Sequence, residues 1–313
     1  MTRTYATAPL ALKTPPDHLS WSQVARLVPN YRFACARAWA YDKLAGLPFE
    51  SSPALAAGDA FDDGVNSLLV ARMQGRDEGT ALEWATRAVG EKLPSAMERV
   101  PNPPGPDKIE EYIGAVNRAL AHFARERVGL IPAAVQTKHR YTVRQRDGEI
   151  RSLVGYSDRI DPDGAVVDHK YSGSARWHAG TPPEVVRGDV NDELWDGDWV
   201  RDKMDQLCVY WLARRAEEAR GVNQPAPVIA RGKLDVMFMR VDMKMPQLRS
   251  YVVEFNEEDE RRVLEAIRQA HDIIRDGRLP ARPGEACGFC SHTARCRADE
   301  ERRGASFAEV IGS

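Results

Sequence analysis

The segment GYSDRIDPDGAVVDHKYSG, residues 155–173, decides the interpretation of this sequence. It places Asp158, Asp168 and Lys170 inside two short apolar stretches that have the composition of strands. A pleated strand favours β-branched and aromatic residues and disfavours aspartate. A buried polar group without a partner costs on the order of 1–3 kcal/mol. The segment is therefore either a solvated hairpin or a functional site.

The alternation of side chains within this hairpin favours a functional site over a solvated hairpin. Residues 161–164, Asp-Pro-Asp-Gly, have the composition of a turn. Residues two apart on a strand face the same way, so Asp168 and Lys170 should point together with Asp158 opposite them. The side chain of His169 should point away, while its backbone carbonyl stays available to a metal. Carboxylates with a carbonyl oxygen suit Mg²⁺ or Mn²⁺, which can serve phosphodiester hydrolysis.

Outside the hairpin, the hydrophobic periodicity predicts an α/β protein. The first half of the chain has helical patterns, and the pattern changes to strands near residue 133. Three strands should lie within residues 133–172, followed by a helix, two further strands and an amphipathic helix. Residues 177–206 form an irregular segment with eight acids and three basic residues, which we interpret as a gate or partner surface. The expected architecture is one α/β core decorated with helices.

Composition limits the class of protein and its partners. The chain has 313 residues, of which 43% are hydrophobic, and a formal net charge of −2. It shows neither an apolar run long enough to span a bilayer nor the pattern of a signal peptide, so we expect a cytoplasmic protein without a membrane partner. A protein that binds nucleic acid by charge alone would be more basic, so such a site must be local or use metal ions.

A second polar pair follows in DQLCVYWLAR, residues 205–214. Gln206 and Tyr210 are four positions apart and therefore share one face of a helix. Beside a carboxylate site, both could hydrogen-bond a phosphate or a metal-bound water. The alternative is a core helix in which Tyr210 is only packed.

The cysteines indicate a metal site or a cluster. Three of them have the spacing C-x2-C-x5-C in CGFCSHTARC, residues 287–296. An odd count without an export signal argues against a disulfide framework. A zinc site remains an alternative, with Cys35 or His292 as the fourth ligand. Cys208 lies in the helix described above and should only pack. The five cysteines are Cys35, Cys208, Cys287, Cys290 and Cys296.

Taken together, these motifs resemble the PD-(D/E)xK nuclease superfamily and, within it, the RecB-like branch, which has D…DxK followed by QxxxY. The resemblance implies a restriction-endonuclease-like core, a mixed central sheet flanked by helices. It also implies that the first aspartate and the acid of DxK bind metal, that the lysine is catalytic, and that QxxxY lies on the next helix. The matching positions are Asp158, Asp168, Lys170, Gln206 and Tyr210.

This chain departs from one motif of that branch. The branch has an upstream helix with G-x-x-x-H, whose histidine binds metal. Here Gly58 is followed by Asp62 at the histidine position, with Asp63 beside it and Asp59 three positions early. A carboxylate suits a hard divalent ion, so Asp62 is the expected ligand. The same change could instead mark a weakened or lost site.

The cysteine pattern narrows the resemblance further. Some of these nucleases, including the CRISPR-associated exonucleases and the AddB-type helicase–nucleases, bind a 4Fe–4S cluster through one N-terminal cysteine and a C-terminal C-x2-C-x5-C. The corresponding residues are Cys35, Cys287, Cys290 and Cys296. Relatives usually have proline after the first cysteine, where this chain has Ala36. Thiolates are the normal ligands of such clusters.

The resemblance also implies a division of the chain, which should form one structural unit. The helical region should contribute Cys35 and Asp62, and the cysteine lobe should close on the N-terminal helices. The expected segments are a flexible arm at 1–17, the helical region at 18–130, the nuclease core at 131–280, the cysteine lobe at 281–300 and a tail at 301–313.

The implied activity is a divalent-metal-dependent deoxyribonuclease, an exonuclease on linear DNA used in recombination, repair or spacer processing. Its partners would be DNA ends or single strands and a helicase, recombination or CRISPR adaptation protein. The sequence has no P-loop motif, so unwinding would come from a partner. Arg159, Arg176 and Trp177 could contact the substrate near the site. The alternative is a non-catalytic iron–sulfur subunit for DNA binding or assembly.

Overall fold

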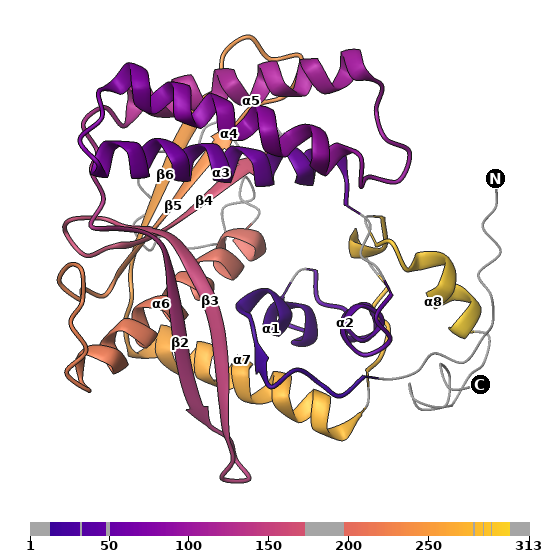
Figure 1. The fold of residues 1–313 in the computed structure, drawn as a ribbon. Coiled ribbons are helices and arrows are strands. Elements are labelled where there is room, and N and C mark those ends of the chain that lie inside the picture. The colour runs from indigo at the N-terminus through magenta and orange to yellow at the C-terminus, as the bar shows by residue number, and fades with distance from the viewer. Residues whose placement is uncertain are drawn as a thin grey trace. The chain divides into compact units, whose positions relative to one another are not determined.

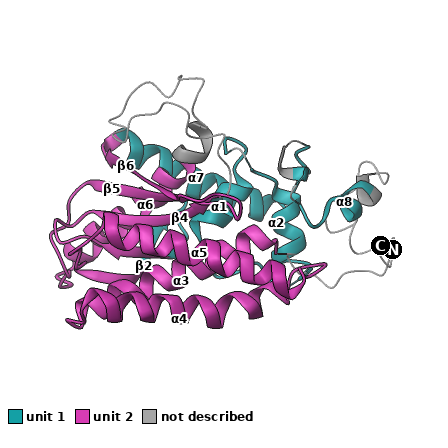
Figure 2. Cartoon of the chain, turned by 90° about the horizontal axis from the view of Figure 1, so that it is seen from above, with its two compact units in different colours: residues 1–49, 140–155, 258–313 teal, residues 50–139, 156–257 magenta. Residues whose placement is uncertain are grey.

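The computed structural model describes residues 13–31, 33–47, 51–172, 197–277, 279–283, 285–288 and 290–300 (Figure 1). The chain divides into two compact units, each built from segments that are separated in sequence (Figure 2). Unit 1 comprises Met1–Phe49, Arg140–Gly155 and Glu258–Ser313. Unit 2 comprises Glu50–His139 and Tyr156–Glu257.

A mixed sheet forms the centre of the fold and confirms the predicted α/β class. Strand β4 pairs antiparallel with β3 and parallel with β5, β6 is antiparallel to β5, and β2 pairs with β3. The parallel pair requires a crossover, which contains the helix α6. The strands are β2 (Ala134–Arg144), β3 (Ile150–Ile160), β4 (Val166–Ser172), β5 (Arg231–Phe238) and β6 (Gln247–Glu254).

Helices of unit 2 pack on both faces of β4. The side chains of His169 and Tyr171 contact Phe123 of α5 and Phe61 of α3, with ring centroids 5.4 and 5.5 Å apart. The alternate residues, beginning with Asp168, face α6 instead. The helices are α3 (Pro53–Met73), α4 (Glu78–Met97), α5 (Pro106–Glu126) and α6 (Gly197–Glu218), and α3–α5 form the layer at the top of Figure 1.

Local signals explain where these helices begin. The Ser52 side chain accepts a hydrogen bond from the Leu55 amide at 3.2 Å, and the Asp77 side chain does the same for the Thr80 amide at 3.0 Å. Proline stands at the first turn of α3 and of α5, where its missing N–H costs nothing. These caps and prolines account for where α3, α4 and α5 begin.

The predicted turn between β3 and β4 is present and depends on its glycine. Gly164 has φ +91°, and a Cβ atom there would lie 1.9 Å from the Pro227 carbonyl oxygen. The Asp163 side chain accepts a hydrogen bond from the Ala165 amide at 3.1 Å. This turn fixes the register that pairs Arg159 with Val167 and Ile160 with Val166.

Unit 1 contains short helices and one strand that the sequence did not predict. The strand β1 (His18–Leu19) pairs parallel with Ser152 and Leu153 of β3. Pro29 lies in the break between α1 and α2, as expected. The remaining elements are α1 (Trp21–Leu27), α2 (Ala36–Lys43), α7 (Glu257–Asp276), the 3-10 helix η2 (Glu285–Gly288) and α8 (Thr293–Glu300).

None of the helices in the described ranges combines the length and the apolar character that a membrane crossing requires.

Candidate active site

The aspartates of β3 and β4 lie across from each other, at the point where the two strands separate. The register pairs Arg159 with Val167, so Asp158 falls opposite Asp168 in the next step. There the Asp158 carboxylate, at Oδ2, accepts a hydrogen bond from the His169 amide at 2.5 Å. The Asp168 side chain is buried, with 2% of its surface exposed. The turn thus brings together two carboxylates that are ten positions apart.

The ammonium of Lys170 lies between these acids. Its Nζ atom is 2.6 Å from Asp168 Oδ2 and donates a hydrogen bond to the His169 carbonyl at 2.8 Å. Burial acts against its charge, but the surrounding carboxylates raise the pKa of Lys170 above its usual value. The side chain is therefore a cation at neutral pH and can offset negative charge. The His169 carbonyl, expected as a metal ligand, lies in the same cluster.

Asp62 of α3 completes the group of acids. Its Oδ1 atom is buried without a hydrogen-bond partner. Burial raises the pKa of Asp62 well above the usual value; Lys170 acts in the opposite direction, and the charges of Asp158 and Asp168 raise it further. The neighbouring Asp63 instead forms an ion pair with Lys92 at 2.8 Å. The helix therefore directs Asp62, and not Asp63, towards the strand carboxylates.

The electrostatics of this cluster suit a hard divalent cation. Burial raises the pKa of Asp158 to about 6, and the charge of Asp168 raises it too, against the effect of Lys170. Three carboxylates, those of Asp62, Asp158 and Asp168, face one ammonium, so the ionised cluster carries excess negative charge. Such a group either takes up protons or binds a cation. Oxygen donors of this kind, one of them without a partner, fit Mg²⁺ or Mn²⁺.

In the part of the chain that the structure describes, no three His, Cys, Asp or Glu side chains converge as a ready-made metal site. In the nuclease motif, donors of the protein itself occupy part of the two strand acids. The Lys170 ammonium lies on Asp168, and the His169 amide lies on Asp158. These donors offset only part of the negative charge of the three carboxylates.

Gln206 and Tyr210 of α6 lie beside Asp168. The Gln206 amide nitrogen is 3.4 Å from Asp168 Oδ1 and donates to the Tyr210 hydroxyl at 2.9 Å. The Tyr210 ring stacks on His139, with centroids 5.0 Å apart, and is almost fully buried. Burial and the charge of Asp168 raise the pKa of Tyr210, so it remains a neutral phenol. Tyr210 is thus both packed and hydrogen-bonded, and it reaches Asp168 through Gln206.

Arg159, expected as a substrate contact, is buried in an ion-pair network. Its side chain is 2% exposed, and it forms ion pairs with Asp161 at 2.7 Å and with Asp235 at 2.9 Å. It also contacts His169 Nε2. The register places Arg159 on the face of the sheet opposite Asp158, where no solvent reaches it. The other two predicted substrate contacts, Arg176 and Trp177, lie outside the described residues.

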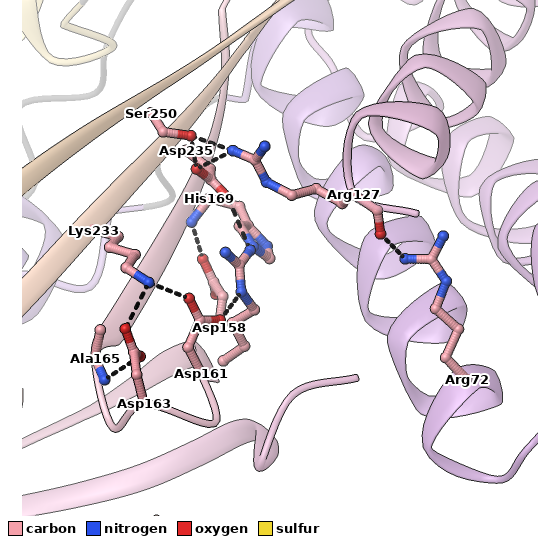
Figure 3. A network of polar contacts seen from close by, with 11 residues as sticks. Arg72, Arg127, Asp158, Asp161, Asp163, Ala165, His169, Lys233, Asp235 and Ser250 are labelled. Carbon is pink, nitrogen blue, oxygen red and sulfur yellow. Dashed lines mark hydrogen bonds and ion pairs between the residues drawn. The ribbon is translucent and has the colours of Figure 1, made fainter. Parts of the chain in front are cut away.

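Asp235 is the central residue that the sequence analysis missed. It lies on β5 next to His169 and accepts hydrogen bonds from Arg127, at 3.0 Å, and from Ser250 (Figure 3). Burial opposes its charge, but Arg159 and Arg127 hold the pKa of Asp235 well below its usual value. An aspartate inside the apolar run LDVMFM was the available signal. This network fixes His169, whose amide holds Asp158.

The cysteines form a separate group in unit 1. Cys35 is the N-cap residue of α2. Burial raises the pKa of the Cys290 thiol, and the charge of Cys35 raises it too. The Thr293 hydroxyl donates to the carbonyls of Cys287, at 2.8 Å, and Cys290, at 2.9 Å. All five cysteines are free of disulfides; Cys287 is exposed. Cys208 is buried in α6, as expected for a packing residue.

The alternative zinc ligand His292 is engaged elsewhere. Its Nε2 atom is 2.9 Å from Asp42 Oδ1, and the same Asp42 carboxylate pairs with Arg26. The imidazole is 5% exposed. The structure thus holds His292 on an acid of unit 1 and leaves the fourth ligand of a metal or cluster at these cysteines a prediction.

Comparison with known proteins gives one family and several similar solved structures, among them two crystal structures. The model of the PD-(D/E)XK nuclease superfamily matches residues 24–297. No curated protein matches the sequence. The crystal structure of SSO0001 is similar over 92% of this chain and 90% of that chain, with 11% identity and a TM-score of 0.40. That of a candidate exonuclease from Eubacterium rectale is similar over 88% of this chain and 93% of that chain, with 14% identity and a TM-score of 0.45.

The family match includes both strand acids, the lysine and the pair on α6, all of which the fold gathers in unit 2. The chain belongs to the PD-(D/E)XK nuclease superfamily.

Proposed function

We propose that this protein is a divalent-metal-dependent deoxyribonuclease of the RecB-like branch. The observation that carries the proposal is the cluster of Asp62, Asp158 and Asp168 around the Lys170 ammonium. Nuclease members of this superfamily use Mg²⁺ or Mn²⁺, and these three carboxylates with the His169 carbonyl would hold such an ion. When bound, such an ion would lower the pKa of the attacking water and offset negative charge on the phosphate oxygens.

The side chains of the protein have distinct tasks in this reaction. Water provides the oxygen that bonds to phosphorus and releases a proton, the bond to the leaving sugar oxygen breaks, and that oxygen takes up a proton. Lys170 remains an ammonium, so it orients the water and stabilises the charge that develops on the phosphate. The His169 amide orients Asp158, and Gln206 orients Asp168.

The proposed activity predicts metal-dependent digestion of DNA. End-labelled single- and double-stranded linear DNA should be degraded with Mg²⁺ or Mn²⁺ and left intact with EDTA, because the carboxylates need the cation to bind phosphate. The product ladder on a gel gives the polarity. A closed circular DNA is the matched substrate without ends, and an exonuclease should leave it intact. A folded, metal-loaded protein that cuts none of these substrates would contradict the proposal.

We further propose that the enzyme is an exonuclease that acts on DNA ends or single strands in recombination, repair or spacer processing. A helicase, recombination or CRISPR adaptation partner would supply unwinding. The replacement of the usual histidine by Asp62 favours one alternative, a non-catalytic subunit for DNA binding or assembly. DNA binding without cleavage in the digestion experiment would support that alternative.

We also propose that Cys35, Cys287, Cys290 and Cys296 bind a 4Fe–4S cluster. The proximity of the Cys35 and Cys290 thiols supports this, because these residues are distant in sequence. The pairing of His292 with Asp42 removes the histidine from the possible ligands. Such a cluster would join the first and last segments of unit 1.

Loss of one thiol should abolish the cluster. Protein purified without oxygen should be brown and contain iron and labile sulfide in equal amounts, and Cys35→Ser should lose both, because each iron needs a thiolate. Cys208→Ala, a matched cysteine variant outside the group, should keep the full iron content. Colourless protein that contains zinc would contradict the cluster and support a structural zinc site.

A further inference from the structure

Gln136 has a backbone conformation that its residue type disfavours. It is the third residue of β2 and has φ +49°, in the left-handed region. Among the described residues other than glycine, Asn102 alone shares a positive φ, at 59°. Asparagine tolerates this region because of its short polar side chain, whereas glutamine does not have that advantage. Such outliers persist where the surrounding structure requires them, often at functional sites.

The Gln136 side chain contacts a predicted metal ligand. Its Nε2 atom donates a hydrogen bond to Asp158 Oδ1 at 3.2 Å. The other oxygen of the same carboxylate, Oδ2, accepts the His169 amide at 2.5 Å. Donors from β2 and β4 therefore hold both oxygens of Asp158, and together they fix the rotation of its carboxylate. The donor from β4 is the main-chain amide of His169, which any residue would supply. The donor from β2 is the side chain of Gln136, so it depends on the residue type.

Gln136 also borders the space that a ligand would enter. An open groove of about 570 Å³ is lined by Gln136 and Asp158 from the sheet and by Asp62 and Asn66 from α3. The Oδ1 atoms of Asp62 and Asn66 are buried there without hydrogen-bond partners. The groove thus presents oxygens that the protein does not satisfy, and buried polar atoms are normally satisfied. A cation or a water that it binds would satisfy them.

We propose that Gln136 is a positioning residue of the nuclease site, which fixes the rotation of the Asp158 carboxylate so that a remaining lone pair on its oxygens can bind the cation. This inference rests on the proposed metal-dependent nuclease and adds to it a residue from β2. The left-handed backbone is the cost of directing the amide at Asp158. Partners of this kind, one step beyond the ligands, orient the ligands and tune their affinity for the metal.

Two variants separate the role of the amide from that of the backbone. Gln136→Ala removes the amide and keeps the strained φ, whereas Gln136→Gly removes the amide and relieves the strain. We expect both to weaken Mn²⁺ binding, followed by electron paramagnetic resonance, by roughly 10- to 100-fold, with a similar loss in DNA cleavage. Gln136→Gly should nevertheless unfold at a higher temperature than Gln136→Ala. A merely structural role would not weaken Mn²⁺ binding in the more stable variant.

Asn102→Gly is the matched control, because it relieves the same type of strain at a position outside the groove. It should raise the unfolding temperature and leave Mn²⁺ affinity unchanged. Wild-type affinity and cleavage in both Gln136 variants would overturn the positioning role and leave the nuclease proposal intact. The wild-type protein could instead bind Mn²⁺ and cleave no DNA. Weaker Mn²⁺ binding in the Gln136 variants would then support the positioning role and contradict the nuclease proposal. A wild-type protein that binds no Mn²⁺ would overturn both.

Discussion

Lys170→Ala should reduce the rate of DNA cleavage by roughly 10²- to 10⁴-fold, the range for a group that assists proton transfer or stabilises charge at the reacting centre. The Lys170 ammonium lies 2.6 Å from Asp168, and 27% of its side chain is exposed. It is thus fixed by the site and still accessible to substrate. Truncation removes the positive charge and leaves the acids in place, so the fold should survive.

The metal dependence of the variant distinguishes a catalytic lysine from a metal-organising one. Without the ammonium, the same carboxylates attract a cation at least as strongly. The concentration of Mn²⁺ that gives half of the maximal rate should therefore not rise in Lys170→Ala, while kcat falls. Lys108→Ala is the control, because Lys108 forms only an exposed pair with Glu111 on α5. Cleavage by Lys170→Ala at the rate of this control would exclude Lys170 from the chemistry.

Asp235→Ala should destabilise the protein by about 3–5 kcal/mol, the usual cost of breaking a buried ion pair. The substitution leaves the guanidinium of Arg159, which is 2% exposed, with one carboxylate partner in place of two. It also removes the carboxylate that Arg127 and Ser250 contact. The free energy of unfolding in urea, measured at pH 7, gives the difference from wild type.

Asp242→Ala is the matched aspartate, because its pair with Arg240 is exposed. Exposed pairs contribute only about 0–1 kcal/mol, so this control should be close to wild type in stability. An Asp235→Ala variant as stable as Asp242→Ala would show that the buried network does not support the fold.

The effect of Asp235 should depend on pH in a defined direction. Arg159 and Arg127 hold the folded-state pKa of Asp235 below that of the unfolded chain. Its contribution is therefore complete above the ordinary aspartate pKa of about 4 and declines as the pH falls below it. The stability difference between wild type and Asp235→Asn should be equal at pH 7 and pH 5 and smaller at pH 3.

The sequence predicted the elements whose causes are local. The Asp-Pro-Asp-Gly turn and the alternation along β4 depend on a few neighbouring residues, so the opposition of Asp158 to Asp168 and Lys170 could be predicted. The helical periodicity of the first half of the chain likewise predicted helices there, and these are α1 to α5. The mixed sheet was implied by the resemblance to the nuclease superfamily.

The remaining features depend on partners that are distant in sequence. From the sequence alone, Arg159 looks like a substrate contact because it lies beside the site. Its ion pair with Asp235, on another strand, is visible only in the fold. The contact of Gln136 with Asp158 and its left-handed backbone arise only when β2 has packed. The two-residue strand β1 has no periodicity of its own and exists because β3 offers it a partner.

The composition of unit 1 has a consequence for synthesis on the ribosome. Its first segment, Met1–Phe49, and its last, Glu258–Ser313, are separated by all of unit 2, including every acid of the candidate site. A chain is made from its N-terminus, so the early segment can pair with β3 midway but meets the last segment only after unit 2 has been made. Premature termination after unit 2 would release a chain with all its candidate catalytic residues, an exposed Cys35 segment and three thiols missing. A truncation after residue 257 should therefore keep the candidate nuclease residues and lose the last segment of unit 1.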